Sequence, residues 1–413
     1  MREMKDSKVA WIGAIPKDWQ LSKIGSLYTQ RNEKVSDKDY QPLSVTMQGI
    51  LPQLATAAKT DDGDNRKLVR VGDFAINSRS DRRGSCGISP LDGSVSLINI
   101  ILTPRTAMHP GYYNWLFHTT LFADEFYKWG HGIVADLWTT RWQEMKSITV
   151  PVPEYAEQER IAAFLDAECA EIDAVLEKTR ASIEEYKKLK QAVITQAVTK
   201  GIRGDRPMKD SGIEWIGNIP VEWDVLSLVA HTSMLTPMRD RPENLDGPIP
   251  WVRIEDFEGK YIESSKAGLG VSMKTVKEMN LKVYPVGTIL CTSSCIMGKC
   301  AIVSRELVSN QRFIGIIPDR TTDKTYLYYL MTSNAERMNF LSTGALQANL
   351  SRSAFEHLKV QFPPYSEQQE IVAYLDDKCE KIDALIARKQ QYLTEIENYK
   401  KSLIYEYVTG KKE

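Results

Sequence analysis

The chain contains two copies of one sequence unit, placed about 200 residues apart. Residues 7–19 read SKVAWIGAIPKDW and residues 211–223 read SGIEWIGNIPVEW, with seven identities in thirteen positions at a constant offset of 204. Two further segments that begin at Pro153 and Pro364 share a Glu-Gln pair followed by Ile, an aromatic residue, Leu and Asp. A repeat of this length is too long for a solenoid, so we predict two related globular domains and a pseudo-twofold molecule.

Composition limits the class of protein. A chain of 413 residues that is 42% apolar can bury two sizeable cores. The 53 basic and 54 acidic residues nearly cancel, so any surface for nucleic acid must be local. The first residues lack an apolar signal core, and no run of about 18 apolar residues occurs. We therefore expect a cytoplasmic protein without a membrane span, whose six cysteines are reduced thiols.

Two long segments lack the residues that interrupt helices. Neither proline nor glycine occurs in residues 154–200 or in residues 365–409, and Gly201 and Gly410 stand where each segment should end. We predict two long helices, here called arms. At about 1.5 Å per residue, some 45 residues would span roughly 65 Å, which is longer than a small domain is wide.

Apolar residues recur on each arm with a seven-residue period. In the second arm they are Leu375, Ile382, Ile396 and Leu403, with Lys389 as an interruption and Leu385, Tyr392 and Tyr399 as the alternate series. In the first arm they are Leu165, Ile172, Tyr186 and Val193, with Val175 and Leu189 as the alternate series. This pattern predicts an antiparallel coiled coil that holds the two domains at opposite ends of a spacer. Arms that pack on their own domains, or that dimerise two chains, are the alternative.

The globular parts have short alternating apolar runs that predict strands, at residues 42–46, 72–76, 249–254, 287–291 and 313–317. Helical patterns lie at residues 112–129 and 326–341. The fold class predicted is α+β, with two mixed α/β domains joined by the long helices. The two domains share this framework but differ in their loops, as expected of two domains that bind different ligands.

Basic residues gather in the loops. Residues 66–83 hold six basic and two acidic residues with Asn77, Ser78 and Ser80 among them, which suits contacts to phosphates and base edges. The predicted DNA contacts in the first domain are Arg70, Ser78, Arg79, Arg82 and Arg83. Those in the second domain are Lys299, Gln311 and Arg312. A solvated charged loop is the alternative for each stretch.

Catalytic motifs are not evident. No GxGxxG opens a helix, and Gly298-Lys299 lacks the flanking residues of a phosphate-binding loop. Phe362 occupies the polar position of an amino-methyltransferase motif in FPPY, which favours a helix lead-in. Asp256, Glu258 and Lys260 resemble a nuclease cluster but favour a solvated strand edge. Cys291, Cys295 and Cys300 lack the paired spacing of a zinc site. We predict neither catalytic nor metal-binding residues.

The order of these motifs resembles the specificity subunit of type I restriction-modification enzymes. The resemblance covers the whole chain and is carried by the two WIGxIPxxW segments, the Glu-Gln helix starts at residues 157–158 and 367–368, and the helix ends at residues 197–199 and 407–409. It implies target-recognition domains at residues 1–152 and 204–362, a central helical arm at 153–203 and a C-terminal arm at 363–413.

The resemblance also implies function and partners. Each domain would read one half of a split, asymmetric DNA target, and the arms would set the unread spacer. The subunit would bind no cofactor. It would dock two methyltransferase subunits, which use S-adenosylmethionine, and two restriction subunits, which use ATP and Mg²⁺. Docking and coiled-coil positions would be Leu165, Ile172, Tyr186, Leu375, Ile382, Leu385 and Tyr399.

Two other classes of function stay open. A scaffold whose arms recruit partners without DNA predicts no sequence-selective DNA retention. A self-sufficient endonuclease predicts metal-dependent cleavage by this chain alone, and it requires an acidic site.

Overall fold

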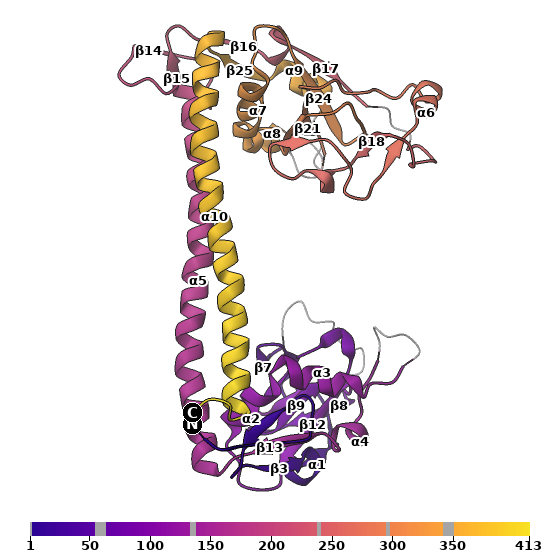
Figure 1. Ribbon diagram of the computed structural model, residues 1–413. Coiled ribbons are helices and arrows are strands. Elements are labelled where there is room, and N and C mark those ends of the chain that lie inside the picture. The colour runs from indigo at the N-terminus through magenta and orange to yellow at the C-terminus, as the bar shows by residue number, and fades with distance from the viewer. Residues whose placement is uncertain (1, 54–62, 133–137, 238–240, 295–297, 342–350) are drawn as a thin grey trace. The chain divides into compact units, whose positions relative to one another are not determined.

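The computed structural model describes residues 2–53, 63–132, 138–237, 241–294, 298–341 and 351–413. The chain forms two compact units (Figure 1). Unit 1 comprises Met1–Ala181 and Gln390–Glu413, and unit 2 comprises Ser182–Lys389. Both long helices, α5 (Tyr155–Lys200) and α10 (Tyr365–Val408), therefore contribute residues to each unit.

Unit 1 is built on a four-stranded sheet in the order β10-β9-β12-β4, with all neighbours antiparallel. Its strands are β4 (Tyr28–Arg31), β9 (Phe74–Asn77), β10 (Cys86–Ile88) and β12 (Asn99–Pro104). A smaller sheet holds β5 (Lys34–Val35), β8 (Arg66–Val69) and β11 (Gly93–Val95). Three two-stranded pairs are β1 (Met4–Asp6) with β2 (Ala14–Pro16), β3 (Gln20–Lys23) with β13 (Thr149–Val152), and β6 (Leu43–Thr46) with β7 (Gly49–Pro52).

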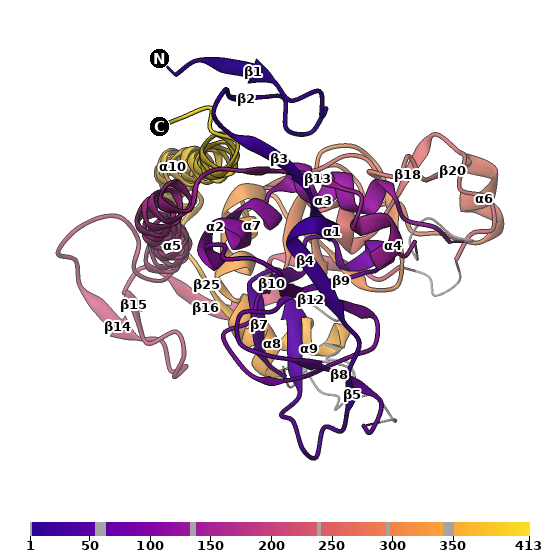
Figure 2. The ribbon, with the colours of Figure 1, turned by 90° about the horizontal axis from the view of Figure 1, so that it is seen from below.

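The short helices of unit 1 are α1 (Ile24–Leu27), η1 (Ser80–Arg82), α2 (Pro110–Phe117), α3 (Thr120–Lys128) and α4 (Trp142–Met145). Helix α2 lies between the four-stranded sheet and α5 (Figure 2). Its buried Tyr112, Tyr113, Leu116 and Phe117 join the core of the sheet to Ile161, Leu165 and Cys169 of α5. The main core of unit 1 therefore extends from the sheet into the arm.

Unit 2 repeats this plan. Its main sheet has the order β17-β24-β21-β22-β19, in which β17, β24, β21 and β22 take the places of β4, β12, β9 and β10. These strands are β17 (Thr232–Leu235), β19 (Tyr261–Ile262), β21 (Ile289–Thr292), β22 (Cys300–Val303) and β24 (Phe313–Pro318). A second sheet holds β18 (Ile249–Val252), β20 (Gly270–Val271) and β23 (Val308–Ser309). Two strand pairs complete the unit: β14 (Met208–Asp210) with β15 (Asn218–Pro220), and β16 (Asp224–Ser227) with β25 (Lys359–Phe362).

The short helices of unit 2 are η3 (Leu228–Ala230), η4 (Ile254–Asp256), α6 (Met273–Glu278), α7 (Lys324–Ser333), α8 (Ala335–Leu341) and α9 (Arg352–His357). Helix α7 occupies the place of α2. The mixed α/β class is confirmed, and the predicted strands and helices match observed elements. The domain boundaries that the resemblance implied stay predictions.

The last tryptophan of each WIGxIPxxW segment donates a hydrogen bond to the glutamate of the Glu-Gln pair in the arm of the same unit. The indole nitrogen of Trp19 donates to Glu157 at 2.8 Å, and that of Trp223 donates to Glu367 at 3.0 Å. Each carboxylate also pairs with an arginine from the segment before, Arg2 in unit 1 and Arg206 in unit 2. The Glu-Gln signature therefore fixes the start of each arm to its own unit.

The adjacent glutamine ties the arm to a helix of the domain. The side chain of Gln158 accepts a hydrogen bond from the backbone N–H of His109 and donates one to the carbonyl of Pro153. The side chain of Gln368 accepts a hydrogen bond from the backbone N–H of Asp323 and donates one to the carbonyl of Pro363. His109 and Asp323 are the N-cap residues of α2 and α7. Both residues of the repeated pair thus have the same structural role in the two units.

Helices α5 and α10 run antiparallel where they pack together within each unit. In unit 1, Phe164 stacks on Tyr407, and Lys400 pairs with Asp173 at 2.6 Å. In unit 2, Lys190 pairs with Asp383 at 2.6 Å. The two lysine-aspartate pairs are equivalent, because both members are related by a constant offset of 210 in the sequence. The repeat found in the sequence therefore extends to individual ion pairs.

The seven-residue series of each arm is buried or half-buried, as predicted. Leu165 and Leu375 are fully buried, Ile382 is buried, and Ile172 and Tyr186 are half-buried. Lys389, which interrupts the series, lies with its amino group 5.7 Å from the ring centroid of Tyr186. This cation–π contact explains how a charged residue occupies an otherwise apolar position.

The predicted alternate series is wrong as a set of buried positions. Val175, Leu189, Leu385, Tyr392 and Tyr399 are 40–53% exposed. The residues that face the partner helix lie one position later, namely Cys169, Leu176, Ile183, Lys190 and Ala197 in α5 and Cys379, Ile386, Leu393, Lys400 and Tyr407 in α10. Both choices fit a mean spacing of 3.5 residues. The correct one is harder to recognise because Lys190 and Lys400 occupy two of its half-buried positions.

We expect Glu157→Ala to lower the free energy of unfolding by about 1–3 kcal/mol, because Trp19 and Arg2 would lose a shared acceptor at a largely buried site. Glu159→Ala, at an exposed position two residues further along α5, is the matched control. Equal denaturation midpoints for the two variants would contradict this role of Glu157.

The same pair of variants should differ in pH dependence. Burial raises the pKa of Glu157, but the stronger combined effect of the hydrogen bonds from Arg2 and Trp19 holds it below the usual value of 4.5. The stability that this carboxylate contributes is therefore present above pH 4.5 and is lost as the pH falls through the lower folded-state pKa. Glu157→Ala should show a shallower loss of stability in this acid range than Glu159→Ala.

The corrected register predicts unequal effects for one substitution at two positions of α10. Leu375→Ala should destabilise the protein by about 2–5 kcal/mol because it leaves a cavity at a fully buried site. Leu385→Ala, at a position that is 41% exposed, should change stability by less than about 0.5 kcal/mol. Urea unfolding of both variants measures the difference, and similar losses would restore the register predicted from the sequence.

Candidate nucleic-acid interface

Equivalent loops carry the basic residues of both units. Residues 78–85 connect β9 to β10 in unit 1, and residues 293–299 connect β21 to β22 in unit 2. The strands take the same places in the two sheets, so these loops leave corresponding ends of corresponding strands. We call them loop 1 and loop 2. Arg79, Arg82 and Arg83 lie in loop 1, and Lys299 lies in loop 2.

Hydrogen bonds hold loop 1 to the rest of unit 1. The N–H of Asn77 donates to Ser85 at 2.8 Å, which closes the base of the loop. The hydroxyl of Tyr127, on α3, donates to the carbonyl of Asn77 at 2.9 Å and lies 3.3 Å from that of Arg82. The N–H of Thr140 donates to the carbonyl of Ser78 at 2.9 Å. The arginines are thus presented by a fixed backbone.

The three arginines of loop 1 are accessible. Their side chains are 39% (Arg79), 70% (Arg82) and 52% (Arg83) exposed. Arg79 and Arg82 lie about 4 Å from Asp81, and Arg83 forms an ion pair with Asp124 of α3. Ion pairs at exposed sites contribute little stability, so a phosphate can replace these carboxylates as the partner at little cost.

Two further predicted contacts of unit 1, Ser78 and Arg70, differ from these arginines in burial or position. The side chain of Ser78 is buried and donates to the carbonyl of Ile98 at 2.6 Å, so the predicted DNA contact of Ser78 is not supported by the structure. Arg70 lies in the turn before β9, at the end of that strand opposite to loop 1. It pairs with Asp92 at 2.9 Å and lies over the ring of Tyr40.

Other basic residues of the same stretch serve the fold. Arg66 is buried and donates to Ser94, and the amino group of Lys67 donates to the carbonyl of Asn99 at 2.7 Å. Burial lowers the pKa of both groups. Residues 66–83 therefore contain both exposed basic residues that can contact phosphates and basic residues that stabilise the fold, and composition does not distinguish the two kinds.

In unit 2 the structure brings Lys299 and Arg312 together at one end of the sheet. The N–H of Thr292 donates to the carbonyl of Lys299 at 3.0 Å, and the next N–H, of Ser293, donates to that of Arg312 at 2.8 Å. Both basic side chains and Gln311 are exposed. Gln311 offers an amide that can pair with an adenine edge.

The carboxylates considered for a nuclease have structural partners. Asp256 is buried, and its carboxylate accepts the backbone N–H groups of Arg253 and Lys266 at 2.7 and 2.9 Å. Glu258 pairs with Lys266, and Lys260 donates to Asp376 at 2.6 Å. Within the described ranges of the chain, no group of three or more His, Cys, Asp or Glu residues could hold a metal ion.

The cysteines considered for zinc are buried in strands. Cys291 and Cys300 are paired across β21 and β22, and burial raises the pKa of the Cys291 thiol. Cys295 lies outside the described residues. Phe362 is buried at the end of β25, before α10, which agrees with a helix lead-in. Across the described part of the chain, no helix combines the length and hydropathy that a membrane span requires.

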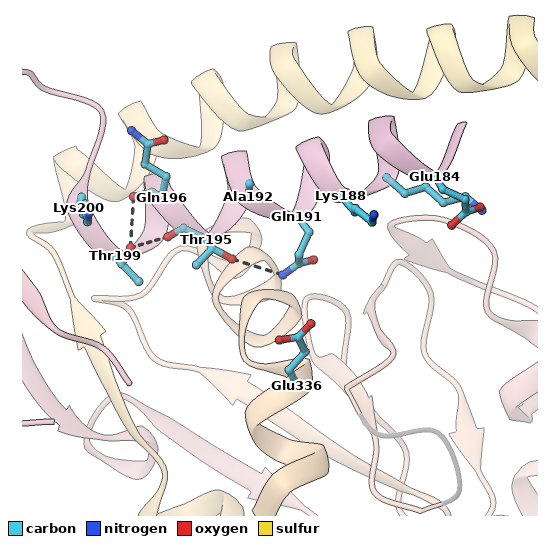
Figure 3. A pocket seen from close by; sticks show the side chains of 10 residues that line it. Glu184, Lys188, Gln191, Ala192, Thr195, Gln196, Thr199, Lys200 and Glu336 are labelled. Carbon is cyan, nitrogen blue, oxygen red and sulfur yellow. Dashed lines mark hydrogen bonds and ion pairs between the residues drawn. The ribbon is translucent and has the colours of Figure 1, made fainter. Parts of the chain in front are cut away.

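A shallow groove of about 850 Å³ runs along the last part of α5 in unit 2 (Figure 3). Its lining includes Glu184, Lys188, Gln191 and Thr199 of α5 and Glu336 of α8. The hydroxyl of Thr199 donates back to the carbonyl of Thr195 at 2.6 Å. Because its polar groups bond within their own helix and do not converge on a common point, we assign the candidate interface to the loops.

Comparison with known proteins shows which family part of the chain resembles. Residues 229–398 match the family described as the type I restriction modification DNA specificity domain. The MjaIX specificity subunit of a type I restriction enzyme from Methanocaldococcus jannaschii is 35% identical over 176 residues, which cover 40% of this chain and 40% of that relative. The chain thus spans well under two thirds of that relative's length.

Solved structures show the same fold. A chain from a study of complex assembly and conformational transition of the type I R-M system has a TM-score of 0.75 at 14% identity, covering 96% of this chain and 99% of that one. The HsdS subunit from Thermoanaerobacter tengcongensis has a TM-score of 0.51 at 16% identity, covering 96% and 98%. The resemblance to type I specificity subunits is confirmed, since residues 229–398 match the model of the type I restriction modification DNA specificity domain family.

Proposed function

We propose that this chain is the DNA specificity subunit of a type I restriction-modification system. Each unit binds one half of a bipartite, asymmetric DNA target. The observation that carries the proposal is that equivalent sheets place different exposed side chains at equivalent loops. Arginines occupy loop 1, whereas Lys299, Gln311 and Arg312 lie at loop 2 and the neighbouring strand start. Related scaffolds with unlike loops suit two half-sites that differ in sequence.

The paired helices set the spacer in this proposal. Two domains that read the same side of a duplex require a separation of about one helical turn, roughly 34 Å, or more. Two helices of 46 and 44 residues that pack antiparallel are suited to fix such a separation. The Trp-Glu-Arg contact at the start of each helix supports this role, because it ties the helix to its unit.

Partner subunits supply the chemistry. We propose that this chain binds no cofactor and that it docks two methyltransferase subunits, which use S-adenosylmethionine, and two restriction subunits, which use ATP and Mg²⁺. Exposed apolar side chains on the arms support docking. In unit 1 these are Val175, Tyr392 and Tyr399, and in unit 2 they are Leu189 and Leu385.

These side chains occupy one flank of the helix pair. When the residues that face the partner helix are labelled a and d of a heptad, each of these exposed residues directly precedes an a position. They therefore all occupy g positions. The other flank carries the ion pair between Arg180 and Glu397. It also contacts the domain helices, since Trp115 donates a hydrogen bond to Asp166 and Tyr329 donates one to Asp376. The apolar flank is therefore free to accept a helix of a partner.

One purification tests function and docking together. The complex isolated from its host through this chain should contain a methyltransferase subunit, and DNA exposed to it should carry methylated adenines in one split, asymmetric sequence. Symmetric or random methylation would contradict two unlike recognition domains. Metal-dependent cleavage by this chain alone would support the endonuclease alternative, and a complex that retains no DNA would support the scaffold alternative.

We expect the double variant Arg82→Ala and Arg83→Ala to flatten the salt dependence of DNA affinity. Each phosphate contact contributes about 0.9 to the slope of log K against log salt, so losing two contacts lowers the slope by about 1.8. Arg70→Ala is the matched control because that arginine lies at the opposite end of β9. A slope that stays the same in the double variant would remove loop 1 from the interface.

A further inference from the structure

A tryptophan distant in the sequence lies directly against loop 1. The backbone of residues 138–140 runs antiparallel to residues 78–80, since the N–H of Ser80 donates to the carbonyl of Trp138 at 2.9 Å and that of Thr140 donates to Ser78 at 2.9 Å. Thr139 forms a bridge with Arg79. Trp138 therefore lies beside the first residues of loop 1, although about 55 residues of sequence separate it from the arginines of that loop.

The position of Trp138 is fixed by its neighbours. Thr139 also bridges His131, with hydrogen bonds of 3.0 and 3.2 Å, and the buried hydroxyl of Thr140 donates to the carbonyl of Phe126 on α3. Gly130 lies beneath the side chain, because a Cβ at that residue would lie 3.1 Å from the Cβ of Trp138. The backbone and the Cβ of Trp138 are thus held against loop 1, α3 and Gly130.

The indole remains accessible. Trp138 is 38% exposed, while Trp11, Trp19 and Trp223 are at most 6% exposed. A large apolar ring left in water next to exposed arginines is the combination that nucleic-acid-binding surfaces use, with cations on phosphates and aromatic rings on bases. A charged loop alone would need no such ring.

We propose that Trp138 is a specificity-determining residue that inserts its indole against a base step in the half-site bound by unit 1. The inference rests on the proposed function. Arg79, Arg82 and Arg83 hold the phosphates around this step, and the ring contacts the base faces as an apolar wedge. The contact is not ionic, so it affects which sequence is bound without changing how many counterions are released.

Unit 1 supplies a matched control. Trp129 follows α3 and is 42% exposed, but its indole nitrogen donates to Glu125 at 3.1 Å. The residues of α3 that contact loop 1 are Asp124 and Tyr127. On a helix, the side of Glu125 and Trp129 is turned away from the side shared by Asp124 and Tyr127. Trp129→Ala removes an equally exposed ring of the same kind.

The test is selection from a pool of duplex DNA with randomised sequence, using the complex purified through the full-length chain. The wild-type complex should enrich two sequence blocks, one for each unit. Trp138→Ala should lose the preference within one block, keep the other, and bind the wild-type sequence roughly 5- to 150-fold more weakly, which is about 1–3 kcal/mol. Trp138→Phe should retain most of the preference, and Trp129→Ala should behave as wild type.

Each outcome decides a separate question. If the wild-type complex enriches no sequence, the proposed function and this inference both fail. If it enriches two blocks and Trp138→Ala enriches the same two with affinity within twofold, only the role of Trp138 fails. An equal loss in Trp129→Ala, a loss in both blocks, or a salt slope that changes in Trp138→Ala would also overturn the inference. Because Trp138→Phe keeps an aromatic ring, retained preference in this variant shows that the effect of Trp138→Ala comes from the lost contact and not from a misfolded loop.

Discussion

A hydrogen bond from a repeated tryptophan to a repeated glutamate anchors each long helix to its globular domain. Trp19 and Trp223 donate to Glu157 and Glu367, and an arginine completes each site. Together with the adjacent glutamine and the apolar residues of the first turns, it fixes the direction in which a helix of more than 40 residues leaves its domain. Loss of the glutamate would remove the hydrogen-bond acceptor of the buried indole N–H, while the arginine would keep its second carboxylate partner, Asp18 in unit 1 and Glu222 in unit 2.

The two helices use their flanks differently. One flank faces the domains through Asp166 and Asp376, which accept hydrogen bonds from Trp115 and Tyr329, and the other exposes apolar side chains. Lysines at half-buried positions, Lys190 and Lys400, reach the aspartates of the opposite helix. Charged residues within the seam limit which registers the pair can adopt, because a shifted register would leave these ammonium groups unpaired near apolar surface.

Equivalent sheets with unlike loops explain how one duplicated scaffold can bind an asymmetric target. The order of the four shared strands is the same in both units, whereas loop 1 carries three arginines and the corresponding end of unit 2 carries a lysine, a glutamine and an arginine. Affinity from phosphate contacts and selectivity from base contacts then depend on different residues of each loop. Loop sequences can change without disturbing the cores, since the basic side chains are exposed.

The duplication, the two long helices, most strands and the resemblance to type I specificity subunits can be read from the amino-acid sequence, because repeats, missing glycine and proline, and apolar periodicity are local properties of the chain. The second inward-facing series of the arms required the three-dimensional structure, since both candidate series share one mean spacing and the partner helix selects between them. The structure also showed that Arg82 is exposed whereas Arg66 and Ser78 are buried, and that Trp138 lies beside loop 1. Burial and long-range pairing depend on contacts between distant segments, which no local pattern records.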